Sequence, residues 1–327
     1  MTRTAYAQAG VDVDAGERAV ALIRSRAAKM SGEFASIAAV PPGMREPLVV
    51  SATDGVGTKL EVARRLGRFD TVGQDLVAMC ADDVACHGAR PAYFLDYLAV
   101  GRLVPERVAE IVGGISGACE QIGCDLLGGE TAEHPGVMEP DEFDLAGFCV
   151  GFVERSDLVD GSAARAGDIV IGMASSGLHS NGFSLIRRLI DDGRLPLTDE
   201  LLTPTRLYAR AVLDLADASV GLRGLAHITG GGLARNVPRA LGGSLGVRVD
   251  PAAWSQPAIF DVVARAAGMD GADMRATFNC GIGFAAIVAP DGAGAVTGFL
   301  AARGIESWPI GDVRPVDDLG GRRYVEA

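Results

Sequence analysis

Carboxylate and ammonium side chains flank a glycine turn early in the chain. The apolar run Leu48–Val50 leads into Ser51-Ala52-Thr53-Asp54-Gly55-Val56-Gly57-Thr58-Lys59. A β-branched run of this kind predicts a buried strand, so Asp54 is expected where that strand ends. Gly55 and Gly57 have no Cβ and let a ligand approach the main chain. We therefore predict that Asp54 holds a divalent metal and that Lys59 compensates a bound anion; a plain strand-turn-helix is the alternative.

A second carboxylate candidate lies on the helix predicted for residues 72–88. Asp83 follows Leu76 by seven residues, which places it on the stripe that would otherwise be apolar. A carboxylate turned toward packing is costly unless a metal or cation compensates it. Asp83 is therefore a stronger metal or phosphate candidate than Asp75 or Asp82.

A third carboxylate follows a second strand-and-glycine pattern. Cys124-Asp125-Leu126-Leu127 predicts a short apolar strand, and Gly128, Gly129 and Glu130 come after it. Carboxylate oxygens are the ligands that Mg²⁺ prefers. Glu130 is accordingly the third metal-ligand candidate beside Asp54 and Asp83.

The loop Ser175-Ser176-Gly177-Leu178-His179-Ser180-Asn181-Gly182 has the features of a phosphate site. It joins a buried strand predicted for 169–174 to a helix predicted for 183–190. Backbone N–H groups and the helix dipole favour an anion at such a junction. His179 belongs to no periodic apolar face, so phosphate contact or proton transfer is favoured over a structural role.

The same pattern recurs after His227, where Gly230, Gly231 and Gly232 approach another helix start. Ligand contacts and surface roles are equally supported for Asn236 and Arg239. The run 277–288 predicts a strand with close-packing glycines. Strands alternate with helices in this half, which predicts a mixed α/β layer.

Composition limits the function classes. The 327 residues suit two domains, which we place at 1–160 and 161–327. A net charge of −12 argues against a general nucleic-acid or membrane-surface binder. The six cysteines form no CxxC pair, which favours reduced thiols in a cytoplasmic protein. No apolar stretch reaches 18 residues, so we expect no membrane span.

A set of segments in order along nearly the whole chain resembles one family, the aminoimidazole ribonucleotide synthetases, or phosphoribosylformylglycinamidine cyclo-ligases, of purine biosynthesis. The matching segments are Ala9–Asp12, Thr53–Lys59, Asp75–Cys80, Phe94–Tyr97, Gly128–Glu133, Ser175–Gly182, Thr229–Leu233 and Thr277–Asn279.

The resemblance implies a two-domain α+β and α/β fold. An N-terminal mixed sheet would pair with its partner's in a homodimer, and a C-terminal α/β domain would follow. It also implies ATP-dependent ring closure of a small ribonucleotide, formylglycinamidine ribonucleotide, with Mg²⁺.

In that reading Asp54, Asp83 and Glu130 hold Mg²⁺, Lys59 neutralises phosphate charge, and His179 contacts phosphate or moves a proton. The residues expected at the nucleotide are Gly55, Gly57, Thr58, Lys59, Ser176, Gly177, Asn181, Gly230, Gly231 and Gly232.

Two positions depart from the family pattern. Members usually carry a glycine-rich run where this chain has Ser31-Gly32-Glu33-Phe34-Ala35-Ser36, and Arg24 stands where a lysine is often found. Fewer glycines and the anion at Glu33 should weaken the approach of a phosphate. Two alternatives therefore stay open: a paralogue that acts on another substrate, and a non-catalytic dimeric pseudoenzyme.

Overall fold

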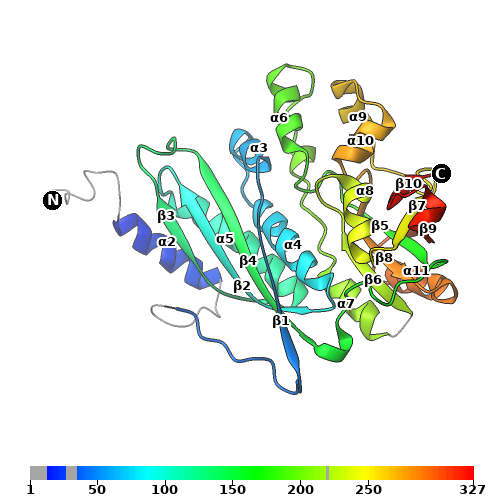
Figure 1. Cartoon of the computed structure of the whole chain (residues 1–327). Coiled ribbons are helices and arrows are strands. Elements are labelled where there is room, and N and C mark those ends of the chain that lie inside the picture. The colour runs from blue at the N-terminus through cyan, green and yellow to red at the C-terminus, as the bar shows by residue number, and fades with distance from the viewer. Residues whose placement is uncertain (1–12, 27–34, 219–220) are drawn as a thin grey trace, which may run out of the picture.

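Two mixed β-sheets with their helices form the computed structural model, which describes residues 13–26, 35–218 and 221–327. The first four strands make one sheet and the six later strands make the other. Figure 1 shows the sheets side by side with α4 (Val72–Ala85) between them. The two-domain prediction with a mixed N-terminal sheet is confirmed at this level, whereas the division at residues 160 and 161 stays a prediction.

The N-terminal sheet has the order β1-β4-β2-β3 and is antiparallel except where β2 pairs with β3. Its strands are β1 Pro47–Gly55, β2 Arg90–Val100, β3 Asp125–Glu133 and β4 Phe143–Glu154. Parallel neighbours need a crossover connection, and α5 (Pro105–Ile122) provides it. Helices α4 and α5 cover one face, and α2 (Val13–Arg26) packs on α5. The remaining short helix is α3 Lys59–Leu66.

The C-terminal sheet has the order β10-β7-β9-β5-β8-β6, and only the β10–β7 pair is parallel. Its strands are β5 Ile169–Ala174, β6 Leu222–His227, β7 Leu245–Val249, β8 Ile282–Val288, β9 Ser307–Pro315 and β10 Tyr324–Glu326. Its α-helices are α6 Phe183–Asp191, α7 Ala209–Asp217, α8 Gly232–Asn236, α9 Ala258–Ala267, α10 Gly271–Thr277 and α11 Ala293–Ala301. Short 3-10 helices are η1 Arg155–Asp157, η2 Asp199–Leu202, η3 Val237–Ala240, η4 Pro290–Gly292 and η5 Val316–Leu319.

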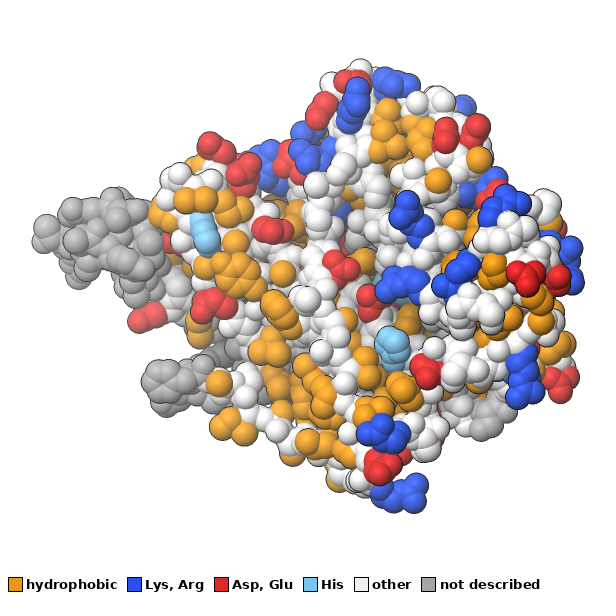
Figure 2. Space-filling view, viewed as in Figure 1, with side chains coloured by type: hydrophobic (Ala, Val, Ile, Leu, Met, Phe, Trp, Pro, Cys, Tyr) orange, Lys and Arg blue, Asp and Glu red, His pale blue; other side chains and the backbone are white. Residues whose placement is uncertain are grey.

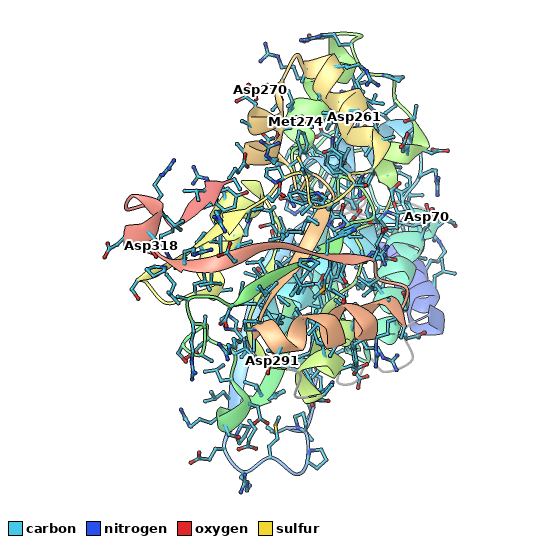
Figure 3. The ribbon with its side chains drawn as sticks, turned by 90° about the vertical axis from the view of Figure 1, so that its right-hand side faces the viewer. Asp70, Asp261, Asp270, Met274, Asp291 and Asp318 are labelled. Carbon is cyan, nitrogen blue, oxygen red and sulfur yellow. The ribbon has the colours of Figure 1, made fainter. Side chains whose placement is uncertain are left out.

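Figure 3 shows how helices lie against this second domain. The labelled Asp291 marks the start of α11, which packs on β5 and β9, and the labels on Asp261, Asp270 and Met274 gather where α9 and α10 lie. Strand β8 is buried along its whole length, as an apolar run between two neighbours requires. Among the described residues, no helix is both long and apolar enough to cross a bilayer.

Two predicted elements have wrong bounds. The strand predicted for 277–288 begins only at Ile282, because Cys280 and Gly281 take φ angles of 45° and 98° that no strand residue adopts. The strand predicted to end before Gly128 instead continues to Glu133. Glu130 therefore lies inside β3 and not in a loop after it.

Close contact between α4 and α5 depends on two glycines. A Cβ added to Gly73 would lie 2.3 Å from the backbone nitrogen of Ile115, and one on Gly114 would lie 2.6 Å from the carbonyl oxygen of Asp70. Either clash is with backbone and cannot be relieved by a rotamer change. This contact fixes the position of α4, which carries three of the candidate aspartates.

Replacing Gly73 with alanine should lower the free energy of unfolding by about 1–3 kcal/mol, because it overpacks the helix contact. The matched control is Gly117→Ala on α5, where an added Cβ meets nothing within 4 Å. That control should be neutral or stabilising, because alanine favours a helix. Urea unfolding would measure both, and equal midpoints for the two variants would contradict the close contact.

Candidate functional site

The buried carboxylates of α4 are Asp75 and Asp82, and this corrects the prediction that Asp83 faces the packing. Asp75 and Asp82 are fully buried, whereas the Asp83 side chain keeps 40% of its exposure. The helix lies between two sheets and is buried around almost its whole circumference. An apolar stripe counted from Leu76 therefore does not mark the buried side.

Asp75 and Asp82 bind the segment of residues 203–209, which the sequence reading did not single out. Thr205 donates to Asp75 from its backbone nitrogen at 2.8 Å and from its hydroxyl at 2.7 Å. Tyr208 and Ala209 donate backbone N–H groups to Asp82 at 3.0 and 2.7 Å. Burial raises the pKa of Asp82 to about 7, against the opposing effect of these donors and of His227. The two carboxylates thus tie the first domain to the second.

Lys59 lies inside the protein and is paired with Asp75. Its Nζ lies 2.9 Å from Asp75 Oδ1, donates to the Thr203 carbonyl at 2.8 Å and stands 5.5 Å from the ring centre of Phe183. Burial lowers the pKa of Lys59, and Asp75 opposes this shift. The side chain is fully buried, so contact with a ligand phosphate would need the Asp75 pair to open.

Asp54, Asp83 and His227 form one electrostatic cluster where the two domains meet. His227 Nδ1 lies 2.9 Å from Asp83 Oδ1, while its buried Nε2 has no hydrogen-bond partner among the described residues. Burial alone would lower the pKa of His227, but Asp83, Asp82 and Asp54 together raise it. Burial also raises the pKa of Asp54, and the nearby Asp83 adds to this.

His227 was not assigned a role from the sequence. It is the last residue of β6 and lies three residues before Gly230, and Asp54 is likewise next to last in β1, before Gly55 and Gly57. A polar residue at the end of a strand, just before glycines, was the signal that could have found it.

Glu130 does not join this cluster within one chain. Asp54 pairs with Gly147, Gly147 with Asp96, and Asp96 with Gly129, so two strands separate Asp54 from the neighbourhood of Glu130. Three strand spacings amount to about 14 Å. No group of three His, Cys, Asp or Glu side chains in the described ranges could hold a metal ion. One chain therefore does not assemble the predicted trio.

His179 is buried in the loop between β5 and α6. It has a φ of 60° and is 1% exposed, and its Nε2 accepts from the backbone nitrogen of Ser176 at 3.2 Å. Burial holds the pKa of His179 well below its usual value, and the positive charges of His227 and Lys59 add to the effect. The ring is therefore neutral at pH 7, and its buried Nδ1 lacks a partner in the described structure.

A row of aromatic rings joins the two histidines. Ring centres are 6.2 Å apart from His179 to Tyr208, 5.3 Å from Tyr208 to Phe284 and 6.1 Å from Phe284 to His227. A Cβ on Gly283 would lie 2.2 Å from the Tyr208 hydroxyl and 2.4 Å from His179 Cε1. Glycine at that position is what allows the row to form.

The two glycine loops of the second domain lie against each other. A Cβ on Gly230 would be 3.5 Å from Asn181 Oδ1, which shows how near the loops are. Asn236 Nδ2 donates to the Gly232 carbonyl at 2.9 Å, and Arg239 donates to Asn236 Oδ1 at 3.2 Å. Asn236 therefore holds the turn from inside, and Arg239 is the neighbouring cation.

Two cavities contain candidate residues. One of about 250 Å³ is lined by Asp83, His227, Asn236 and Arg239 together with β1 residues. The other, of about 290 Å³, is lined by Glu130 and Asp96 with residues of α2 and α5. Burial raises the pKa of Asp96 to about 7.

In the loop at 31–36, residues 31–34 lie outside the described residues, and so does the side chain of Arg24.

Comparison with known structures shows that the fold recurs. Hydrogenase maturation protein HypE superposes with a TM-score of 0.69 at 19% identity over 93% of this chain and 92% of its own. Thiamine-monophosphate kinase from Stenotrophomonas maltophilia K279a gives a TM-score of 0.65 at 18% identity over 95% of this chain and 94% of its own.

Sequence comparison is more specific. Residues 36–153 match the model "AIR synthase related protein, N-terminal domain" and residues 165–322 match its C-terminal counterpart. The phosphoribosylformylglycinamidine cyclo-ligase of Pseudothermotoga lettingae is 45% identical, with 95% of this chain and 97% of that protein covered. The protein of the same name from Sorangium cellulosum is 48% identical, with 96% of each covered. The chain therefore belongs to the family of AIR synthase related proteins that includes the phosphoribosylformylglycinamidine cyclo-ligases.

Proposed function

We propose that this protein is an ATP-dependent cyclo-ligase that converts formylglycinamidine ribonucleotide to aminoimidazole ribonucleotide, with ADP and phosphate as the other products. The supporting observation is the identity of 45% and 48% to two relatives of that name over nearly the full length of each chain. The γ-phosphoryl group passes to the formyl oxygen, an internal amine attacks the formyl carbon, and phosphate leaves with that oxygen. The reaction belongs to purine biosynthesis, and the free thiols of all six cysteines support a cytoplasmic location.

The residues of this chain support such a transfer by positioning and by charge compensation. The loops at Ser176–Asn181 and at Gly230–Gly232 present backbone groups and small side chains for the ribonucleotide and for ATP. Gly55, Gly57 and Thr58 form the turn at the other domain. His179, which is neutral and has one nitrogen free, is placed to hold or move a proton at Nδ1. We keep the proposal that Lys59 compensates the phosphate charge, which requires its ion pair with Asp75 to open.

The donor set at Asp54 and Asp83 fits a magnesium ion. Proximity of the two carboxylates contributes to the raised pKa of Asp54, and a divalent cation would relieve that repulsion. Bound Mg²⁺ would supply charge neutralisation for the phosphates of ATP. Glu130 would complete the set from the other subunit of a homodimer, since it lies on the opposite edge of the sheet.

The open face of the N-terminal sheet supports this dimer. Hydrophobic side chains gather over its strands in Figure 2, on the face that α4 and α5 do not cover. Val49 is 64% exposed, Phe148 45% and Tyr97 37%, and they come from the adjacent strands β1, β4 and β2. A two-fold interface uses the same patch on both subunits. We therefore propose that two copies pair through this face.

The reaction is tested with purified protein, ATP, Mg²⁺ and formylglycinamidine ribonucleotide. We expect one aminoimidazole ribonucleotide for each ADP released, detected directly by mass spectrometry. ADP release without that product would support a paralogue with another substrate. Folded protein that binds no nucleotide at millimolar ATP with magnesium would support the pseudoenzyme.

Asp54→Asn and Asp83→Asn should each lower kcat about a hundredfold or more, because each removes a charge that the phosphates and the metal need. Nucleotide binding measured with and without Mg²⁺ gives a second readout, and its magnesium dependence should weaken. Asp291→Asn is the matched control, since Asp291 lies on the far surface beside α11. Wild-type rates with normal magnesium dependence in both variants would remove the metal-site proposal.

Phe148→Asp should shift the protein toward the monomer, because a carboxylate in an apolar interface has no compensating partner. The control is Leu158→Asp, whose side chain is similarly exposed at 37% but lies outside the sheet face. Sedimentation equilibrium of both variants and of the parent protein measures the effect. A parent protein with the mass of a single chain would contradict the dimer.

A further inference from the structure

A pocket of about 270 Å³ has no residue of the proposed active site in its lining. It is formed where the end of α5, the start of α7 and the end of α11 meet. Three arginines line it, Arg206, Arg210 and Arg303, with Asp214 as the only carboxylate in its lining. We call it the arginine pocket. Such a concentration of positive charge is unusual in a chain whose net charge is −12.

The guanidinium groups of this pocket have weak partners. Arg206 reaches the Gly304 carbonyl and Arg210 the Gln121 carbonyl, each at 3.5 Å, and Arg303 lies 3.5 Å from Asp214. Some other arginines of the described structure meet carboxylates more closely, at 2.6 Å in the pairs Arg275–Glu326 and Arg65–Asp191.

The Nε of Arg206 is buried and has no hydrogen-bond partner among the described residues. A buried donor without a partner is costly, and a bound acceptor would remove that cost. The arginine pocket therefore has one buried donor without a partner, and its other polar contacts are long. Arg303 also lies over the Phe299 ring, 3.6 Å from its centre.

The lining also indicates the kind of anion. Guanidinium groups match the oxygens of phosphate in pairs and bind it more specifically than an ammonium does. Ile122, Leu207 and Ile305 supply apolar wall beside the arginines. A phosphate group with a compact organic part would use both kinds of lining, whereas an inorganic ion would use only one.

The pocket connects to the active site through the segment 203–209. Arg206 lies in the middle of this segment, between Thr205, which donates to Asp75, and Tyr208, which donates to Asp82. The same segment accepts from Ser176 through the Pro204 carbonyl at 2.6 Å, so it also holds the His179 loop. Fixing Arg206 from outside would therefore restrain the residues that hold that loop.

We propose that the arginine pocket binds a small phosphorylated organic molecule and that its occupancy stiffens the segment 203–209. This site is separate from the one that holds Asp83 and His227, and the proposal does not rest on the reaction proposed above. Its ligand acts as an effector, because no candidate catalytic residue lines the pocket.

The binding test uses adenosine monophosphate and pyrophosphate as separate probes in calorimetric titrations. The double variant Arg210→Glu/Arg303→Glu should lose at least tenfold in affinity at one site for adenosine monophosphate, because two guanidinium groups become carboxylates. Asp83→Asn should leave that site unchanged, which separates it from the active site. Arg188→Glu is a charge-reversal control at one exposed arginine, since its side chain is 81% exposed on α6.

Arg210→Gln alone keeps the test valid if the double variant fails to fold, because Arg210 is an exposed side chain without a salt bridge in the described structure. If these variants bind adenosine monophosphate with unchanged affinity and stoichiometry, the proposal that the arginine pocket is a binding site is wrong. Tighter binding of the nucleotide than of pyrophosphate supports an organic ligand. Equal binding of the two would contradict the proposal that the ligand has an organic part.

Hydrogen exchange tests the connection to the active site. Adenosine monophosphate should slow exchange of the backbone amides of Thr205, Tyr208 and Ala209 in the parent protein and in Asp83→Asn. It should leave them unchanged in the double variant. Binding without any change in these amides would overturn the coupling to the segment 203–209.

Discussion

Two buried carboxylates, Asp75 and Asp82, determine how the halves of this protein meet. A buried carboxylate needs hydrogen-bond donors, and Oδ1 of each of these side chains takes its backbone donors from one segment of the other domain. Lys59 adds an ammonium to the same network. The donors are backbone N–H groups and one hydroxyl, so these hydrogen bonds hold the backbone of the segment directly. The loops around His179 and the cluster around His227 take their places from that arrangement.

The site that results separates two kinds of histidine. His179 is buried among positive charges and stays neutral, while His227 lies among three carboxylates that favour its charged form. The rings of Tyr208 and Phe284 lie between them. The neutral His179 and the His227 that pairs with carboxylates are therefore separated by packed aromatic side chains.

Much of the fold could be predicted from local patterns. Strand β1, helix α5 with its first-turn Pro105 and the left-handed Gly123, and strand β5 with the loop and helix after it all follow from apolar runs and from glycines. The bounds of β8 and β3 could not be predicted so well. A left-handed residue such as Cys280 carries no sequence signal, and β3 continues through its glycines because β2 pairs with them.

Parts of the candidate site were harder to predict for a related reason. Which face of α4 is buried depends on the C-terminal sheet, which packs on the other side of the helix. The spacing of apolar residues within α4 does not predict that contact. The separation of Glu130 from Asp54 follows from the strand order, which local patterns do not encode. His227 and Lys59 owe their surroundings to segments more than a hundred residues away in the chain.

The apolar core has a consequence for the history of this architecture. One continuous cluster of buried side chains runs from Val62 and Leu76 in the first domain to Phe284 and Leu300 in the second. We expect two halves that share a core in this way to unfold together. Recombination that exchanged one half for a distant counterpart would have to match this shared core and the donors of Asp75 and Asp82 together. We therefore expect the two halves to be inherited as a pair, although each has a sheet of its own.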